Sequence, residues 1–394
     1  MSRSKEQSNK GRKNRRGRRI LITIRTILLI LVVLAALLIA VNPFLVRYLN
    51  IDPLGQLMGD FSINDLLNLP KETIEDLTTE TSETPRPSDS LSPVTYTPAV
   101  TSNPTVKDEE ARAFADGYVF RETKQTKKIR DDIFSDKYAF ASKYAVLVDL
   151  DYNEIVAQKD AKVRMAPASM TKILTILVAA EHVDLDRIDT DVFPIDADLA
   201  VYSYVNDFSS VGWTEGDRPT IRDLFYGCIL PSGADAAVGL AEYVSGSQEE
   251  FVKLMNEKLK ELGIDKTTHF TNCVGLFDDD HYSTCYDMAV IMKAAIENTF
   301  CRQVLSAHTY TTAPANEEPG GFALSNWFLR RIEDKDTHGE VRCAKTGFVN
   351  ESGCCAASYQ ISDSGGHYLC VTGDAYSVWK CIYDQVALYA QFTE

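Results

Sequence analysis

The sequence predicts a mixed α/β domain in the C-terminal two thirds of the chain. Short β-rich runs occur at both ends of that region, and segments with helical periodicity lie between them. Of the 394 residues, 45% are hydrophobic and 25% are charged, which is typical of a chain with a globular core. Because strands come from both ends, we expect a single sheet assembled from the two ends of the domain and flanked by helices.

The predicted domain begins with a β-hairpin and continues into a buried helix. Residues 144–150 and 154–158 are β-rich and flank the turn-forming run Asp151-Tyr152-Asn153. Residues 169–182 are apolar nearly all round, which indicates a helix in the core rather than on the surface. Later helices are expected at residues 221–228, 234–244, 248–262 and 377–392, and late strands at residues 341–346, 354–361 and 367–372.

The N-terminal part of the chain predicts a membrane anchor. Residues 20–41 are 22 residues with a single charge, Arg25. As a helix they would be about 33 Å long, against roughly 30 Å of hydrocarbon. Nine Lys and Arg in residues 1–19 favour a cytoplasmic N-terminus. We therefore expect a single-pass protein of the cell membrane with its folded domain outside. A cleaved signal peptide is the alternative, but its apolar region would usually span about 7–15 residues.

The segment between the anchor and the domain is expected to be a linker. Ser, Thr and Pro make up 19 of the 37 residues from 71 to 107. Such a composition cannot bury enough apolar surface to offset the loss of chain entropy. The predicted organisation is thus a tail at 1–19, an anchor at 20–41, a juxtamembrane segment and linker at 42–129, and a folded domain at 130–394.

Charge and cysteine content exclude two classes of function. The formal net charge is −15, with +9 in the first 25 residues and −24 in the remainder. Because so acidic a body repels phosphate backbones, nucleic-acid binding is not expected. The nine cysteines show no zinc-ligand spacing, so no metal site is expected. Their odd number leaves at least one thiol free or paired between chains.

Ser169 and Lys172 open the predicted buried helix. An N-cap serine is the ordinary structural explanation for Ser169, but a capping box would place Glu or Gln where Lys172 stands. A cation in the first turn opposes the helix dipole, so we expect another role for Lys172. The spacing of three puts both side chains on one helix face, and burial should lower the lysine pKa. A neutral Lys172 could then remove the serine proton.

Two further motifs follow Ser169 and Lys172 along the chain, and the order of all three is informative. Pro-Ser-Gly-Ala-Asp at residues 231–235 opens a predicted helix, and Lys-Thr-Gly at residues 345–347 ends a predicted strand. With the flanking runs LFYGCILPSGADAAVGLAEYVSGS, HFTNCVGL and CAKTGFVNESGCC, these motifs resemble those of penicillin-recognising serine enzymes. The flanking runs are most similar to those of the low-molecular-mass D-alanyl-D-alanine carboxypeptidases, the serine DD-peptidases. The resemblance covers roughly residues 140–394.

The resemblance implies a fold and a reaction. The fold would be that of the serine β-lactamases and DD-peptidases, an antiparallel sheet flanked by helices plus a helical subdomain. Ser169 would attack the D-Ala-D-Ala bond of a peptidoglycan stem peptide and form an acyl-enzyme that water hydrolyses. Lys172 would be its base, and Ser232 would relay a proton to the leaving group. β-Lactam antibiotics would acylate the same serine, and no cofactor would be required.

The resemblance also implies a set of substrate-binding residues. Lys345 and Thr346 would bind the terminal carboxylate of the substrate, and Gly347 would let the substrate backbone lie against the strand. The amides of Ser169 and Phe348 would form an oxyanion hole. The ordinary alternative for Ser232 is a helix cap, and for residues 345–347 an ordinary turn.

One residue departs from the family pattern. The middle motif is normally Ser-x-Asn, and Ala234 occupies the third position here. An asparagine amide would hold the lysine and bond the substrate's peptide carbonyl, so we expect a slow carboxypeptidase that Ala234→Asn accelerates or leaves unchanged. A cell-wall-binding or penicillin-sensing module stays an alternative for this reason. A β-lactamase or a DD-endopeptidase on the same fold are the others.

Overall fold

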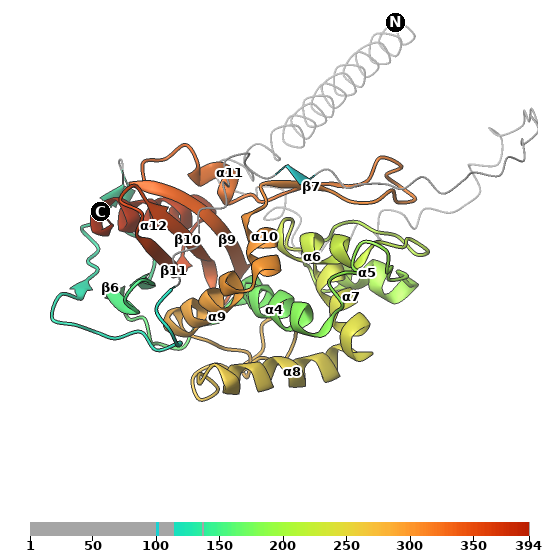
Figure 1. Cartoon of the computed structure of the whole chain (residues 1–394), viewed down its shortest axis with the longest axis horizontal. Helices are drawn as coiled ribbons and strands as arrows, with labels where there is room; N and C mark the ends of the chain where they lie inside the picture. Colours follow the sequence, from blue (N-terminus) through green and yellow to red (C-terminus); the bar gives the residue numbers. More distant parts are fainter. Residues whose placement is uncertain (1–99, 102–113, 136–137, 394) are drawn as a thin grey trace, which may run out of the picture. The chain divides into compact units, whose positions relative to one another are not determined.

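The structure is a computed structural model that describes residues 100–101, 114–135 and 138–393 (Figure 1). Its helical elements are η2 (Ala168–Thr171), α4 (Lys172–His182), α5 (Ala197–Val205), α6 (Ile221–Ile229), α7 (Ala234–Ser245), α8 (Gln248–Glu261), α9 (Cys285–Glu297), α10 (Thr299–Ser306), α11 (Leu329–Ile332) and α12 (Val378–Phe392). Its strands are β1 (Val100–Thr101), β2 (Lys127–Lys128), β3 (Phe134–Ser135), β4 (Tyr138–Ala139), β5 (Tyr144–Asp149), β6 (Glu154–Lys159), β7 (Thr309–Thr311), β8 (Ala323–Ser325), β9 (Gly339–Val349), β10 (Gly353–Ser362) and β11 (His367–Ala375).

The central sheet has the strand order β2-β6-β5-β11-β10-β9. All its pairings are antiparallel except the short one between β2 and β6. The hairpin β5–β6 joins the late strands through β11, where Val146 pairs with Val371. The prediction of a mixed α/β fold with one sheet built from both ends of the domain is therefore confirmed.

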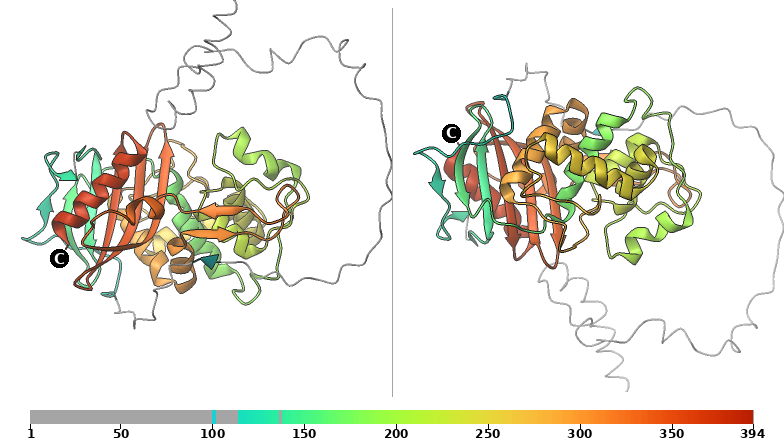
Figure 2. Two further views of the ribbon diagram at one scale, coloured as in Figure 1. Left: turned by 90° about the horizontal axis from the view of Figure 1, so that it is seen from above. Right: turned by 90° about the horizontal axis from the view of Figure 1, so that it is seen from below.

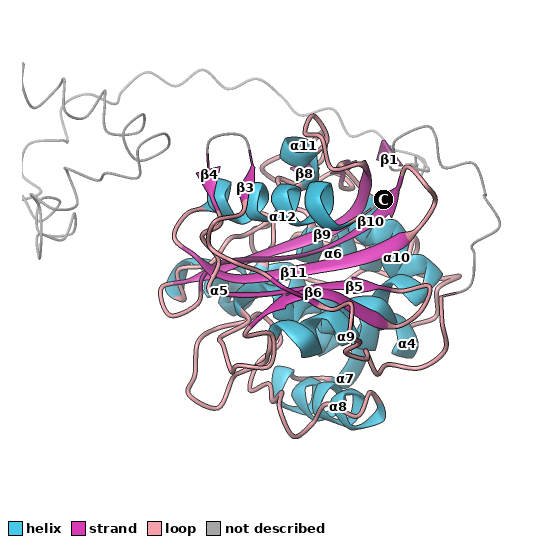
Figure 3. Ribbon diagram, turned by 90° about the vertical axis from the view of Figure 1, so that its left-hand side faces the viewer, coloured by secondary structure: helices cyan, strands magenta, loops and turns pink. Residues whose placement is uncertain are grey.

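Each face of the sheet is covered by helices, as Figure 3 shows. Val146 and Val148 of β5 pack into the larger hydrophobic cluster, which includes residues of α4 and α9. Ala145 and Leu147 point to the opposite face and pack with residues of α12, such as Leu388. This alternation is the period of two that a strand buried on both faces requires.

Beside the sheet lies a helical region built around α4 (Figure 2). Nine of the eleven residues of α4 are buried, and the helix packs against α6, α7, α8 and α9. Its burial explains why the sequence pattern of α4 is apolar all round. No helix among the described residues is long and apolar enough to cross a membrane, and the anchor predicted at 20–41 lies outside them.

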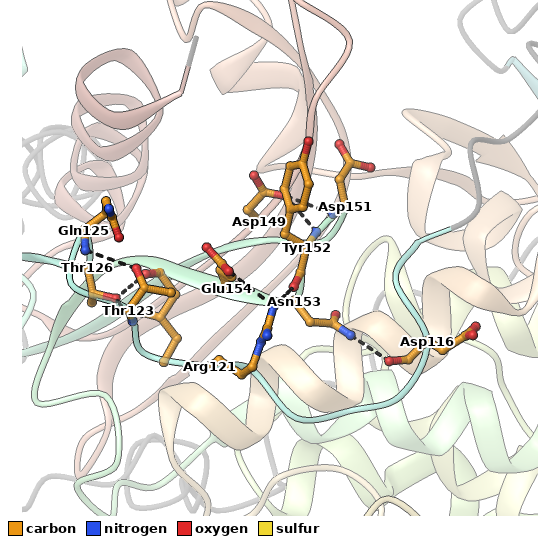
Figure 4. Close-up of polar contacts among 11 residues, drawn as sticks. Asp116, Arg121, Thr123, Gln125, Thr126, Asp149, Asp151, Tyr152, Asn153 and Glu154 are labelled. Atoms are coloured by element: carbon orange, nitrogen blue, oxygen red, sulfur yellow. Dashed lines mark hydrogen bonds and ion pairs between the residues drawn. The ribbon is translucent and has the colours of Figure 1, made fainter.

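Residues 114–129 precede the expected domain start at residue 130, yet they pack against the domain. The amide of Asn153 donates to the carbonyl oxygens of Ala115 and Asp116 at 3.0 and 2.9 Å (Figure 4). The buried Lys293 of α9 also donates to the Ala115 carbonyl, at 2.6 Å. Phe120 is buried in the larger hydrophobic cluster. The segment is thus part of the folded unit, held by contacts with residues distant in sequence.

Within the described residues, the helices and late strands expected from the sequence are all present, with ends that shift by a few residues. The first turn of the helix expected at 169–182 is the 3₁₀ turn η2. The structure adds α5, α9 and α10, which the sequence analysis did not predict. Each begins at a side-chain cap: Asp196, Thr284 and Asn298 accept hydrogen bonds from backbone amides of the first helical turn. These caps were a readable signal for the three helix starts.

Candidate active site

Ser169 and Lys172 meet at the junction of η2 and α4. The Lys172 ammonium donates to Ser169 Oγ at 3.0 Å and to the Val274 carbonyl oxygen at 2.8 Å. Ser169 lies inside the 3₁₀ turn, and no side-chain capping hydrogen bond is made at the start of either helix. The N-cap explanation for Ser169 therefore does not hold in the structure, and its hydroxyl is left to face the lysine.

The surroundings of Lys172 favour its neutral form. The side chain is fully buried, and this desolvation lowers the pKa of Lys172 to about 8. The ring of Phe208 lies 5.4 Å from its Nζ atom. Near pH 8 the amine is thus neutral in a substantial fraction of molecules and can accept the proton of Ser169.

Two glycines, Gly275 and Gly347, lie against the turn that carries Ser169. Ala168 adopts a φ of +47°, a left-handed conformation that is strained for a residue with a Cβ. A Cβ added to Gly275 would lie 2.0 Å from the Ala168 carbonyl oxygen, and one added to Gly347 would lie 2.9 Å from that of Pro167. A side chain at Gly347 would therefore collide with the turn that carries Ser169. This close approach is a reason for glycine that the sequence analysis did not give.

Ser232 and Lys345 form a second serine–lysine pair. The Lys345 ammonium donates to Ser232 Oγ and to the Thr346 carbonyl oxygen, both at 2.8 Å. Ser232 adopts a φ of +64° in the loop before α7, whose N-cap is Gly233 with no side-chain bond. Ser232 is therefore not a helix cap. Burial lowers the pKa of Lys345 to about 7, and the positive charge of Lys172 adds to the effect.

Both pairs open onto one cleft of about 350 Å³. The cleft lies where the helical region meets the edge strand β9. The structure thus brings all seven residues predicted for the site to one place, with the two lysines beneath its surface. The five predicted residues that line the cleft directly are Ser169, Ser232, Thr346, Gly347 and Phe348.

The loop after α8 contributes residues that the sequence analysis did not identify. Asn272 Oδ1 accepts hydrogen bonds from the amides of Val274, Gly275 and Leu276 at 3.2, 2.7 and 2.9 Å. This places the Val274 carbonyl where Lys172 donates to it. A signal for this arrangement was present in the run HFTNCVGL. Its Asn precedes Val274 by two residues, and an Asn side chain can bond the backbone two residues on and so position the Val274 carbonyl.

His281 lies behind the same loop and has a structural role. Its Nδ1 accepts from the Thr271 amide at 3.1 Å, so a neutral ring carries its proton on Nε2, which lies 2.9 Å from Thr171 Oγ1. Burial lowers the pKa of His281 to about 3. A ring that stays neutral at physiological pH orients the turn rather than carrying protons.

Ala234 is buried and does not line the cleft. Its amide donates to the Ser209 carbonyl oxygen at 2.9 Å. The next residue, Asp235, accepts from the amide of Val211 and the hydroxyl of Ser210. These contacts tie the start of α7 to residues 209–211, which adjoin and overlap the cleft-lining residues 207–209.

All nine cysteines lie within the described residues, and all are buried and free. Three of them, Cys354, Cys355 and Cys381, line the cleft. Burial raises the pKa of Cys354 to about 11 and that of Cys355 to about 12, so these thiols are poor nucleophiles. Within the described part of the chain, no group of three or more His, Cys, Asp or Glu could hold a metal ion.

Solved structures show the same fold. A mutant of the Streptomyces K15 DD-transpeptidase superimposes with a TM-score of 0.58 at 23% identity, over 64% of this chain and 99% of that one. The D-alanyl-D-alanine carboxypeptidase DacD from Francisella tularensis superimposes with a TM-score of 0.55 at 24% identity, over 66% and 71%.

Sequence relatives agree with the fold. The D-alanyl-D-alanine carboxypeptidases DacF of Bacillus subtilis and DacC of Escherichia coli are both 38% identical, over 168 and 156 residues. These matches cover 41% and 39% of this chain, and the chain spans only about two fifths of each relative, 41% and 39%. A family model described as peptidase S11, D-alanyl-D-alanine carboxypeptidase, matches residues 131–365. Since that match covers more than half of the chain, the protein belongs to the D-alanyl-D-alanine carboxypeptidase family of peptidases.

Proposed function

We propose that the protein is a serine-type D-Ala-D-Ala carboxypeptidase that acts on peptidoglycan stem peptides through an acyl-enzyme on Ser169. The observation that carries the proposal is the 3.0 Å hydrogen bond between Ser169 and a buried lysine whose pKa is lowered to about 8. A serine hydroxyl becomes a nucleophile only where a base can take its proton, and Lys172 is that base.

Acylation follows from the geometry of the two serine–lysine pairs. Ser169 Oγ forms a bond to the carbonyl carbon of the penultimate D-alanine, and its proton passes to Lys172. The amides of Ser169 and Phe348 donate to the resulting oxyanion. The carbon–nitrogen bond then breaks, and the leaving amine takes a proton from Ser232. Ser232 recovers the proton that Lys172 took from Ser169, so Lys172 is neutral again, while Lys345 stays hydrogen-bonded to Ser232. Free D-alanine departs.

Deacylation uses the same groups in reverse. A water molecule gives its proton to Lys172 while its oxygen bonds to the acyl carbon. The ester bond to Ser169 then breaks, and Ser169 recovers from Lys172 the proton that the water gave up. Penicillins enter by the same acylation step, because their strained amide presents a carbonyl to the same nucleophile.

The terminal carboxylate of the substrate is held at the second pair. Lys345 and Thr346 lie beside Ser232, so the negative charge would rest next to the lysine. Burial lowers the pKa of Lys345 to about 7 in the free protein, and a bound carboxylate would raise that pKa again by attraction. Substrate binding would thereby keep Lys345 positively charged, as binding of the carboxylate requires.

The test is release of D-alanine from a defined pentapeptide by the full-length protein, followed by mass spectrometry. Free D-alanine and a tetrapeptide are expected from the wild type, and neither from Ser169→Ala. Covalent labelling by penicillin without any release of D-alanine would instead support the penicillin-sensing alternative.

We infer in addition that the protein is held in the cell membrane by residues 20–41, with the domain outside. Support comes from the single charge in these 22 residues and from the nine basic residues before them. Protease added to intact cells should release a fragment cut between residues 71 and 107. A mature N-terminus near residues 40–45 would contradict the anchor and favour a cleaved signal peptide.

A further inference from the structure

Cys355 lies directly behind the nucleophile, where the central sheet meets the turn that carries Ser169. It belongs to β10 and stands opposite Gly347 of β9 in the sheet. The residue is 1% exposed, and its Sγ atom lies 3.2 Å from the Gly347 carbonyl oxygen and 3.5 Å from the Pro167 carbonyl oxygen. A buried thiol that only fills the core needs no polar partner. The Cys355 S–H, in contrast, is shared between two carbonyl oxygens of the site.

The first of these contacts orients the amide of Phe348. The Gly347 carbonyl and the Phe348 N–H belong to one planar peptide group, and in a trans peptide they point in opposite directions. Because the Gly347 carbonyl faces Cys355 of β10, the Phe348 N–H faces away from β10. β9 is the last strand of the sheet and Phe348 lines the cleft, so this N–H is directed towards the cleft. The thiol thus holds the plane of the peptide group that supplies one donor of the oxyanion hole.

The second contact holds the turn that supplies the other donor. The Pro167 carbonyl oxygen also accepts from the Met170 amide at 3.1 Å, and this bond closes the turn around Ser169. A Cβ added to Gly347 would lie 2.8 Å from Cys355 Sγ and 3.0 Å from the Ser169 amide nitrogen. The thiol, the Gly347 backbone and the Ser169 amide are therefore in close contact. Cys355 ties the nucleophile turn to the edge strand through its two carbonyl partners.

We propose that Cys355 is a positioning residue that holds the amides of Ser169 and Phe348 in the geometry of an oxyanion hole. The inference rests on the proposed function, which places the oxyanion between these two amides. Burial raises the pKa of Cys355 to about 12, so the thiol keeps the hydrogen that it donates. Because the oxyanion forms only on the way to the tetrahedral intermediate, loss of this positioning should lower kcat and leave KM nearly unchanged.

The experiment measures D-alanine release from diacetyl-L-lysyl-D-alanyl-D-alanine by full-length variants. Rates are expressed per site that labelled penicillin acylates, so only folded molecules count. Cys355→Ala should lower kcat by about ten- to a hundredfold, somewhat less than the loss of a whole oxyanion-hole donor, with KM within about twofold of the wild type. Cys355→Ser, which keeps a donor, should retain kcat within about threefold.

Two further readouts separate positioning from a general loss of structure. In the acyl-enzyme formed with penicillin carrying ¹³C at the lactam carbonyl, the infrared stretch of the ester carbonyl should lie at higher frequency in Cys355→Ala, because its hydrogen bonds are weaker. The midpoint of the pH profile of acylation should stay near pH 8, because the pKa of Lys172 is set by the burial of that lysine.

Cys343→Ala is the matched control. Cys343 is also 1% exposed, and its thiol donates to the Arg302 carbonyl oxygen at 3.8 Å, away from the cleft lining. This variant should keep both kcat and the carbonyl frequency of the wild type. If Cys355→Ala matches Cys343→Ala in both readouts, or if its pH midpoint moves with its rate, the positioning role alone is overturned. A wild type that neither reacts with penicillin nor releases D-alanine would overturn the proposed function, and the role of Cys355 with it.

Discussion

The two serine–lysine pairs of the cleft have the same chemistry but different origins. Ser169 and Lys172 are three residues apart at one helix start, whereas Ser232 and Lys345 come from a loop and from an edge strand. Both pairs are hydrogen-bonded, at 3.0 and 2.8 Å, and both lysines are buried. The first distance is set by one continuous element, and the second by how the helical region packs on the sheet.

This difference in origin indicates which step of the mechanism is less sensitive to substitutions elsewhere in the protein. Nucleophile activation rests on a pair inside a rigid, buried helix start, so only changes to the pair or its turn should abolish it. Proton relay and carboxylate binding depend on the interface between the helical region and the sheet. Substitutions at this interface should therefore reduce activity in part rather than abolish it.

The largest effect is expected from the local pair. Ser169→Ala removes the nucleophile, and Lys172→Met removes its base. Each should lower acylation by labelled penicillin by roughly ten-thousandfold or more, as is typical of residues that act as a catalytic unit. Ser209→Ala, in the same cleft, is the control and should label normally. Normal labelling of Ser169→Ala would refute the assignment of the nucleophile.

The pair formed across the interface should give smaller losses. Ser232→Ala and Lys345→Met should each reduce kcat/KM for D-alanine release by about ten- to a thousandfold, the range of general acid–base contributions and charged hydrogen bonds. Because the two side chains are in contact, the double variant should lose less than the product of the single losses. Strictly multiplicative losses would argue that the pair does not act as a unit.

The pH dependence distinguishes the lysines from other bases. The pKa of Lys172 is lowered from 10.5 to about 8, so the acylation rate should rise about tenfold per pH unit below pH 8 and level off above it. Because Lys345 loses its charge near pH 7, before Lys172 titrates, Lys345→Met should leave the midpoint of this rise near pH 8. A profile that is flat from pH 6 to pH 9 would exclude Lys172 as the base.

The pH dependence of stability should follow the titration of the same two lysines. The pKa of Lys172 is about 8 in the folded protein and that of Lys345 about 7, both below the ordinary value of 10.5. The unfolded chain therefore binds more protons between about pH 7 and pH 10.5, and the free energy of unfolding should rise with pH through that window. In Lys172→Met the rise should be smaller, which urea titrations at several pH values can measure.

The smallest effect on rate is expected at Ala234. The sequence analysis expected Ala234→Asn to accelerate acylation or leave it unchanged, but Ala234 is fully buried and absent from the cleft lining. A larger polar side chain there should cost about 1–3 kcal/mol of stability through overpacking, with a change in acylation rate of less than about threefold. Ala234→Ser, a smaller intrusion, is the matched control. An acceleration of tenfold by asparagine would show that the side chain can reach the cleft.

The sequence by itself determined the local part of the site and the class of fold. The spacing of Ser169 and Lys172 fixes their common face in any helix, because helical geometry needs no tertiary contact. The β-rich runs and the apolar pattern of residues 169–182 likewise indicated the sheet and the buried helix. The resemblance of the motifs added Ser232 and residues 345–348, which the structure places in the same cleft.

Only the tertiary structure decided what joins these parts. The Val274 carbonyl that receives Lys172, the glycine contacts that clamp the Ser169 turn and the burial of Ala234 all depend on elements that are distant in the chain. That residues 114–129 belong to the domain was likewise not predictable from local sequence, because their partners Asn153 and Lys293 lie far along the chain. Local patterns carry no information about such contacts, because long-range packing chooses which surfaces meet and which polar groups are left to pair across them.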